Sequence, residues 1–567
     1  MSSLSASSFR LLEAFKSSLR PGQFLQTVQD HGIILIGVIF GLIVLYAARY
    51  ITSPYRKVPP GPRGYPIIGN LLEMSGGLAG QWLKYAGWHK KYGDLTYLNV
   101  AGQPVVIINS RKVAADLLDR RSAKYSDRPR NAVIDIMTRE LFFVFTENGD
   151  TWRRMRNTAN EGFSKSAVKG FYETQNTEAV VLASELLVHP TQWDRHFRHA
   201  PASVTLSILY GYPTFKSDMD PIVVAINDFA ERIFKAGSTG NYLVHFFPWL
   251  RYFPSSLAKW KRDAEAWYKQ DTAMFERLFQ TAEENVAKGE DDKSVAATLI
   301  REREKNKLSP IERVWYGGTM YFGGADTTSV TLAWWLLAML AYPETQARAH
   351  AELDAVVGRA RPPTFADRPH LPYVHAMVKE ALRWRPAGPL GAPHQSTADD
   401  MYEGMYIPKG TICIANVMHM NRDPVLFGKN TDDFDPSRHL DGSGYLGSGV
   451  SDSTLKEHGH FTYGFGRRNC VGRYMADNSL FIDMAVMLWA TKFERKKDAS
   501  GRFLPLNLEG WVDVGLVVLV DFITYSYVDA NVGIYFRRRP IPFEAEITPR
   551  FPEAPAMLAQ ERELRGL

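Results

Sequence analysis

The stretch Tyr463-Gly-Phe-Gly-Arg-Arg-Asn-Cys470-Val-Gly472 holds one of only two cysteines in 567 residues and stands directly before an apolar segment. A cysteine at the start of a helix meets unpaired backbone N–H groups and the positive end of the helix dipole, which stabilise its thiolate form. Cys470 is therefore a candidate nucleophile or metal ligand.

The other cysteine, Cys413, lies in a strand-like run. Two thiols in so long a chain are typical of a reducing compartment, which argues against a disulfide. Structural zinc takes about four Cys or His ligands in paired spacings, and no C-x-x-C pair is present. The glycines near Cys470 allow close approach of a flat group, and Arg468 could pair with carboxylates, so an iron porphyrin would fit. A nucleophile with a nearby histidine base stays open on these residues alone.

The same stretch resembles the heme-binding signature of the cytochrome P-450 family, F-x-x-G-x-R-x-C-x-G. Gly466, Arg468, Cys470 and Gly472 match it, and Tyr463 replaces the usual phenylalanine. The resemblance implies that Cys470 is the axial thiolate ligand of the iron of heme b (iron protoporphyrin IX). It also implies that Gly466 and Arg468 help to bind the heme.

Other segments resemble motifs of this family in the expected order. Trp152 and Arg156 are four residues apart and share a helix face, from which the resemblance implies contacts with a heme propionate. A basic surface helix is the alternative. His394 stands at the family's position for a further propionate contact, with a structural histidine as the alternative.

The longest predicted helix begins at the capping box Ser309-Pro310-Ile-Glu312 and ends before Pro343. Inside it, Gly323-Gly-Ala-Asp326-Thr327-Thr328 resembles the oxygen-activation motif of the family. An acid followed by an alcohol is costly to bury in an apolar helix without a purpose. The resemblance implies that Asp326 feeds protons inward and Thr327 directs them to dioxygen. We expect the paired glycines to let the helix open beside the iron. A solvent-facing turn is the alternative.

Glu380 and Arg383 are three residues apart, and in isolation such a pair would usually be a surface salt bridge. However, Phe434-Asp-Pro-Ser-Arg438 resembles the family's segment whose arginine joins that pair. We therefore predict a buried ion network of Glu380, Arg383 and Arg438, in which loss of one member strands a buried charge.

The fold class predicted is mainly α with a smaller β region (α+β), a cytochrome P-450 fold in which the long central helix crosses the heme. Alternating patterns predict a β-hairpin over 95–110 and short extended runs over 405–414. Helical patterns cover 343–357, 371–384 and 475–489. Because no linker or repeat interrupts the body, we expect one catalytic domain over 65–567.

Gly32 to Ala48 is an unbroken apolar run that, extended to Ile51, reaches about the 20 residues of a membrane-spanning helix. A signal peptide would have a shorter apolar core, and a buried helix would rarely lack polar residues for so long. Basic residues are more frequent after the run than before it. The sequence thus predicts a tail over 1–31, a transmembrane anchor over 32–51 and a proline-rich hinge over 52–64. The catalytic domain is then expected on the cytosolic face of the endoplasmic reticulum membrane.

Residues 519–536, LVDFITYSYVDANVGIYF, stand between a strand near Trp511 and the run Arg537-Arg-Arg-Pro540, which family members join directly. We interpret this segment as a retained intron in the gene model, in preference to a genuine β-rich insertion. Reads of the transcript that span it would contradict this interpretation. The tail over 1–31 is also longer than usual.

The formal net charge of +6 is scattered, without a basic stripe that interleaves aromatic residues, so nucleic acid is not an expected partner. The resemblance implies a monooxygenase that inserts one oxygen atom from O2 into a lipophilic small molecule. A secondary metabolite such as a terpenoid, or a xenobiotic aromatic, is the expected substrate. Electrons are expected from NADPH through an NADPH-cytochrome reductase, since no flavin-binding region is found. A heme-thiolate isomerase or dehydratase and a non-catalytic heme-binding protein are the alternatives.

Overall fold

The computed structural model describes residues 37, 38, 40, 41, 44, 48 and 51–567, except 75–79, 215–219, 238–240, 246, 290–291, 448–456 and 514–537. The predicted tail, most of the predicted anchor and the atypical segment 519–536 lie outside the described residues. Within the part that is described, no helix is long and apolar enough to cross a membrane. The chain divides into two compact units, one up to Pro59 with Asp399–Pro408, the other Pro60–Ala398 with Lys409–Leu567.

The smaller unit contains a short 3-10 helix, η1 (Pro54–Lys57), and an antiparallel hairpin of β4 (Asp400–Tyr402) and β5 (Met405–Ile407). Ser53 caps η1 by accepting a hydrogen bond from the N–H of Tyr55. The hairpin turns at Glu403 and Gly404, whose φ angles of 49° and 81° are those of a tight two-residue hairpin loop.

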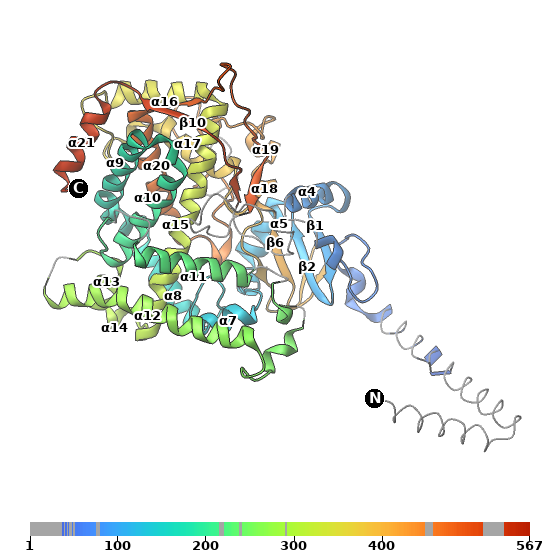
Figure 1. The fold of residues 1–567 in the computed structure, drawn as a ribbon. Helices are drawn as coiled ribbons and strands as arrows, with labels where there is room; N and C mark the ends of the chain where they lie inside the picture. Colours follow the sequence, from blue (N-terminus) through green and yellow to red (C-terminus); the bar gives the residue numbers. More distant parts are fainter. Residues whose placement is uncertain are drawn as a thin grey trace, which may run out of the picture. The chain divides into compact units, whose positions relative to one another are not determined.

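The larger unit is mostly helical with a smaller β region, as predicted (Figure 1). Its helices are α3 (Leu71–Met74), α4 (Gln81–Tyr92), α5 (Arg111–Ala114), α6 (Ser122–Tyr125), α7 (Ala132–Thr138), α8 (Asp150–Gly162), α9 (Tyr172–Val188), α10 (Trp193–Tyr210), α11 (Pro221–Gly237), α12 (Lys259–Ala287), α13 (Val295–Arg301), α14 (Arg303–Asn306), α15 (Pro310–Ala341), α16 (Pro343–Val356), α17 (Pro372–Trp384), α18 (Val417–Met420), α19 (Pro424–Phe427), α20 (Arg473–Ala490) and α21 (Ala554–Leu564).

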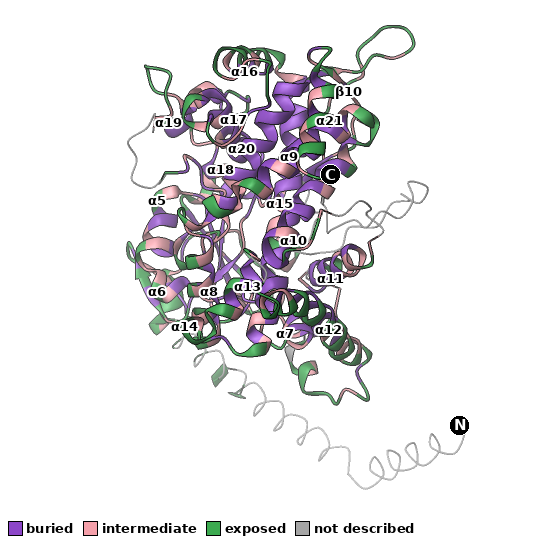
Figure 2. Cartoon of the chain, turned by 90° about the vertical axis from the view of Figure 1, so that its left-hand side faces the viewer, coloured by how far each residue is buried: buried purple, intermediate pink, exposed green. Residues whose placement is uncertain are grey.

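Helix α15 is the element around which this unit is built. Its first turn has the predicted capping box, because Ser309 accepts from the N–H of Glu312 while Glu312 accepts from the N–H of Ser309. The 32 residues that follow are apolar on almost every face, and such a helix is stable only when it is surrounded. It packs against α10, α12, α16, α17 and α20. Figure 2 shows α15 and α20 buried along most of their length.

One four-stranded sheet has the order β1-β2-β6-β3, from β1 (Leu95–Val100), β2 (Gln103–Ile108), β6 (Ile412–Ala415) and β3 (His394–Gln395). The predicted hairpin is β1 and β2. Strand β6 runs parallel to β2, and β3 pairs with it so that His394 is opposite Cys413. The sheet thus fixes the backbone of His394 beside two buried strands.

Two further strand pairs involve the C-terminal part of the described chain. Strand β7 (Thr491–Arg495) pairs with β10 (Ala545–Pro549). Strand β8 (Trp511–Asp513) pairs with β9 (Arg538–Pro540), with Trp511 opposite Pro540. The strands on either side of residues 514–537 therefore pair with each other. Whether residues 519–536 belong to the protein stays a prediction.

Candidate active site

A cavity of about 330 Å³ lies between α15, α8, the loop before α20 and the loop before β3. Six of the residues predicted from the sequence line it, namely Trp152, Arg156, Thr327, His394, Arg468 and Cys470. Gly466 and Asp326 do not line this cavity. Segments far apart in the sequence thus converge on one space, which no single motif could have indicated.

Cys470 lies in an irregular loop, three residues before α20 begins at Arg473, so it precedes the helix. Its N–H donates to the carbonyl oxygen of Tyr463 at 2.7 Å. The exposed surface of Cys470 faces the cavity, while protein otherwise surrounds the side chain. Burial raises the pKa of the Cys470 thiol, and the charge of Arg156 and the N–H of Gly472 offset this only in part. A bound cation is therefore needed to hold it as thiolate.

The two cysteines form no disulfide, because both thiols are free. Cys413 is buried in β6, where desolvation raises its pKa far above the usual range. It is therefore a structural thiol, and only Cys470 is placed for chemistry.

Gly466 has a φ of 59°, and a Cβ atom there would lie 2.0 Å from the carbonyl oxygen of Leu118. Gly464 has a φ of 72° but open space around the same position. The loop therefore needs glycine twice for backbone conformation, but only Gly466 also needs it for close packing.

The Gly466→Ala variant is expected to lose stability by at least about 2 kcal/mol more than Gly464→Ala. Both variants force alanine into a positive φ, so their difference isolates the clash with Leu118. Thermal unfolding of the holoprotein measures it. Equal losses in the two variants would contradict the inferred close approach.

Three buried arginines line the cavity, namely Arg128, Arg156 and Arg468. None of them forms an ion pair with another described residue. Arg468 donates to the carbonyl oxygens of Ser126, Phe143 and Thr146 at 2.6–3.1 Å, and its guanidinium lies 4.1 Å from the ring centre of Trp152. Arg128 donates to the carbonyl oxygens of Val144, Ala392 and Pro393. Arg156 donates to both oxygens of Asn469.

Burial lowers the pKa of all three guanidinium groups, and to a lesser degree so does the charge of a neighbouring arginine, which for Arg156 is Arg473. Asp127 is the one carboxylate that acts favourably on Arg128 and Arg468. In addition, the buried Nε of Arg156 has no hydrogen-bond partner in the described part of the chain. Uncompensated buried charge is costly, so this donor set fits a ligand with two carboxylates, as heme has. The polar groups of the cavity therefore fit heme, as its thiol does.

His394 is buried, and its Nδ1 donates to the carbonyl oxygen of Tyr125 at 2.7 Å. Burial and the charge of Arg128 lower the pKa of His394 to about 3, so the imidazole is neutral. With Nδ1 as the donor, a neutral Nε2 can only accept. His394 can therefore contact a propionate only if that anion also raises its pKa enough for protonation.

On α15, the hydroxyl of Thr327 donates to the carbonyl oxygen of Gly323 at 2.9 Å, and that of Thr328 to Gly324 at 3.2 Å. The helix runs unbroken through both glycines, so the expected opening is wrong for this structure. A Cβ on Gly324 would lie 3.0 Å from Thr205 Oγ1, which shows that this glycine serves helix packing instead. Gly323 and Thr327 face the cavity, whereas Asp326 is buried beside it.

Two residues near the site were missed from the sequence. Arg128 follows no periodic pattern and becomes a cavity residue only through the fold. Arg539, in β9, is buried and donates to Ser329 Oγ at 2.6 Å and to Asp194 Oδ1 at 3.0 Å. Ser329 lies one helical turn after Asp326, and the charge of Asp326 acts on Arg539. In the sequence, the run 537–540 indicated only the family's expected join to the strand near Trp511.

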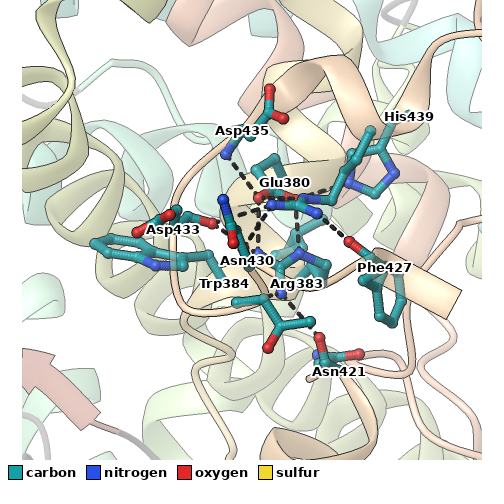
Figure 3. A network of polar contacts seen from close by, with 12 residues as sticks. Glu380, Arg383, Trp384, Asn421, Phe427, Asn430, Asp433, Asp435 and His439 are labelled. Carbon is teal, nitrogen blue, oxygen red and sulfur yellow. Dashed lines mark hydrogen bonds and ion pairs between the residues drawn. The ribbon is translucent and has the colours of Figure 1, made fainter. Parts of the chain in front are cut away.

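The structure brings Glu380, Arg383 and Arg438 together, outside the cavity lining. Figure 3 shows Glu380 and Arg383 among their polar contacts. Both Glu380 oxygens accept from Arg383 at 2.7 Å, and Oε1 also accepts from Nε of Arg438 at 3.0 Å. His439, which was missed from the sequence, contacts Oε2 at 3.0 Å. The Glu380 and Arg383 side chains are fully buried. The network ties α17 to the segment that precedes the Cys470 loop.

A single thiol that faces a cavity rimmed by uncompensated guanidinium groups, beside one long buried helix, is the arrangement of the heme-thiolate proteins. The family model of the cytochrome P-450s matches residues 59–505. The chain therefore belongs to the cytochrome P-450 family, and it is a heme-thiolate monooxygenase of the fungal type.

Its relatives include a cytochrome P-450 monooxygenase of Armillaria gallica, 53% identical over 527 residues, which are 93% of this chain and 96% of that protein. Cytochrome P-450 monooxygenase 58 of Postia placenta is 40% identical over 547 residues, or 96% of this chain and 98% of that protein. A cytochrome P-450 monooxygenase of Amanita muscaria is 37% identical, covering 92% of this chain and 96% of that protein. The likeness extends over nearly the whole of each chain.

Proposed function

We propose that this protein is a membrane-anchored monooxygenase that inserts one oxygen atom from O2 into a lipophilic small molecule, with electrons from an NADPH-cytochrome reductase. A secondary metabolite such as a terpenoid, or a xenobiotic aromatic, is the substrate class. The observation that carries the proposal is that Cys470 and Thr327, from distant parts of the chain, line one cavity.

In this proposal Cys470 would bind the heme iron, and Trp152, Arg156, Arg468 and Arg128 would hold the propionates, together with His394 where a propionate raises its pKa enough for protonation. Gly466 keeps the Cys470 loop close to the residues before α6. When bound, the heme would supply the activation of dioxygen, and Cys470 would serve as its thiolate ligand.

Residues of α15 would supply protons to the cavity. The Thr327 hydroxyl already donates to the Gly323 carbonyl oxygen, so it can accept a second hydrogen bond from a donor in the cavity and hold that proton in place. Asp326, one residue earlier and buried, is the acid that supplies protons from the side of Ser329 and Arg539.

The substrate class follows from the walls of the cavity. Apolar side chains supply most of the lining beyond the thiol and the cations, among them Phe143, Val144, Phe145, Met320, Phe322 and Ala387. Polar substrates would lose hydration there without replacement. This favours a lipophilic substrate.

Membrane association is supported by the segment around η6 (Pro248–Tyr252). Large apolar side chains are exposed there, including Leu243 at 70%, Trp249 at 57%, Tyr252 at 80% and Leu257 at 77%, and Arg251, Lys259 and Lys261 lie among them. Exposed aromatic residues next to basic ones are typical of a membrane interface. The segment supports contact with a membrane surface. Placement on the cytosolic face of the endoplasmic reticulum membrane is proposed from the predicted anchor over 32–51 and the basic residues that follow it.

A reductase site is supported by a basic hollow next to the Cys470 loop. Arg153, Lys165, Arg467 and Arg473 line this hollow, whose volume is about 670 Å³. Such a surface favours an acidic partner and speeds its encounter. Electrons delivered there would enter close to the thiolate ligand.

The proposal is tested first by the absorption spectrum of the heme protein and then by its catalytic turnover. Reduced protein under carbon monoxide should show the Soret band of a thiolate-ligated heme, and a histidine-type spectrum would refute the proposal. With reductase, O2 and a screen of terpenoids and aromatics, NADPH consumption should rise with one substrate class. Thiolate ligation without any reductase-dependent NADPH consumption would favour the non-catalytic alternative.

The Thr327→Ala variant is expected to lower product formation roughly a hundredfold, the lower end of what positioned proton transfer contributes. Because the iron can still be reduced, NADPH consumption should continue and yield hydrogen peroxide. Thr327→Ser keeps the hydroxyl and should restore the amount of product formed per NADPH consumed. Unchanged product per NADPH in the alanine variant would contradict the role of Thr327.

A further inference from the structure

The loop that carries Cys470 contacts a polar cluster that the proposed chemistry does not use. The carbonyl oxygen of Tyr463 accepts the N–H of Cys470 at 2.7 Å, while the Tyr463 hydroxyl donates to Asp477 Oδ1 at 2.6 Å. The other Asp477 oxygen contacts Nδ1 of His458 at 3.3 Å. One residue, Tyr463, therefore links the backbone of the ligand to a carboxylate. This tyrosine is also the one departure of the chain from the family signature.

Asp477 is held firmly. It lies on α20, the helix that follows the Cys470 loop, and its side chain is 17% exposed. The rings of His458 and His460 lie 5.0 Å and 4.9 Å from the ring of Tyr463, centre to centre. Aromatic packing thus fixes the tyrosine, and the tyrosine fixes the carboxylate. In such a setting of low dielectric, a fixed charge acts more strongly than in water.

The carboxylate is ionised in the folded protein. Burial opposes this, but the hydrogen bonds and charge of His458 and the hydroxyl of Tyr463 outweigh burial and lower the pKa of Asp477 to about 2. The titratable groups that face it are His458, His460 and Lys379, and burial holds the pKa of His460 well below its usual range. Tyr463 joins this carboxylate to the backbone N–H of Cys470 through two hydrogen bonds.

We propose that Asp477 is a positioning residue of the heme-thiolate centre, whose negative charge, held in place by Tyr463 and His458, lowers the reduction potential of the iron bound to Cys470. The inference rests on the proposed role of Cys470. Reduction adds an electron to the centre, and an anion at short range makes that addition less favourable. The consequence is a centre that resists reduction before substrate is bound.

A matched control is available on the same helix. Asp483 is also buried on α20, but burial, with a contribution from Glu178, raises its pKa well above the usual range. Burial thus disfavours the charged form of Asp483. Asp483→Asn makes the same chemical change as Asp477→Asn at a buried position of the same helix where the charged form is disfavoured.

The experiment is a spectroelectrochemical titration of the substrate-free holoprotein. Asp477→Asn should shift the midpoint potential to more positive values, Tyr463→Phe should shift it less because the charge remains, and Asp483→Asn should leave it unchanged. The Soret band of the reduced carbon monoxide complex reports whether the thiolate is still bound. An unchanged potential in Asp477→Asn with the thiolate retained overturns the proposal, as does an equal shift in Asp483→Asn.

If Asp477→Asn loses the thiolate ligand, Tyr463→Phe becomes the deciding variant. It keeps the carboxylate and removes one of the two hydrogen bonds that hold it. A smaller positive shift is then expected, and an unchanged or more negative potential overturns the proposal. The wild-type spectrum is measured first, so failure of the Cys470 assignment is seen separately from failure of this inference.

Discussion

Replacing Cys470 by serine is expected to abolish the thiolate Soret band and to lower monooxygenase activity on the order of 10³-fold or more, the scale seen when an essential group is removed. The surroundings already raise the pKa of the thiol, and an alcohol is a much weaker acid, so serine would stay protonated. No anionic ligand would then donate electron density to the iron. Heme binding itself should weaken less, since Arg128, Arg156 and Arg468 remain.

The matched control for this variant is Cys413→Ser. Cys413 is buried in β6, outside the cavity lining, and its Sγ lies 3.6 Å from the carbonyl oxygen of Thr411, a contact that serine could replace. Its spectrum and turnover should match those of the wild type. A Cys470→Ser protein that keeps the thiolate Soret band, or a Cys413→Ser protein that loses it, would contradict the assignment.

The features predicted well from the sequence are those with a local signal. The capping box at Ser309 and the proline at 343 define both ends of α15, because caps and breakers act on the residues beside them. Trp152 and Arg156 share the inner face of α8 for the same reason, since residues four apart share a helix face. The glycines, arginines and cysteine of the loop before α20 carried the resemblance.

The features that the sequence could not predict depend on contacts between distant segments. Arg128 reaches the cavity through carbonyl groups of residues 144, 392 and 393, and Arg539 reaches α15 from β9. Neither contact leaves a periodic trace along the chain. The close packing of Gly324 against Thr205 was also not predictable, because Thr205 comes from α10, far from Gly324 in the sequence.

The second large effect is expected from Glu380→Gln, which should destabilise the holoprotein by about 3–5 kcal/mol, the usual cost of stranding a buried charge. Arg383 is fully buried and also donates to the carbonyl oxygens of Asn421, Thr431 and Asp433, so it cannot turn to solvent. Among the described residues, Glu380 is the carboxylate that balances it. Equilibrium unfolding in denaturant measures the loss.

The pH dependence of stability also tests the role of Glu380. Burial alone would raise the pKa of Glu380, but the charge and hydrogen bonds of Arg383, with the contact of His439, hold it well below the usual range. A depressed carboxyl pKa stabilises the fold above the unfolded value of about 4.3, and this stabilisation is lost as the pH falls below it. As the pH falls, the free energy of unfolding of the wild type should therefore decrease because Glu380 becomes protonated. That of Glu380→Gln should decrease less over the same pH range.

Asp263→Asn, which breaks an exposed pair with Lys259, should cost at most about 0.5 kcal/mol. If Glu380→Gln loses no more stability than this control, or if its stability depends on acidic pH as that of the wild type does, then other groups balance Arg383.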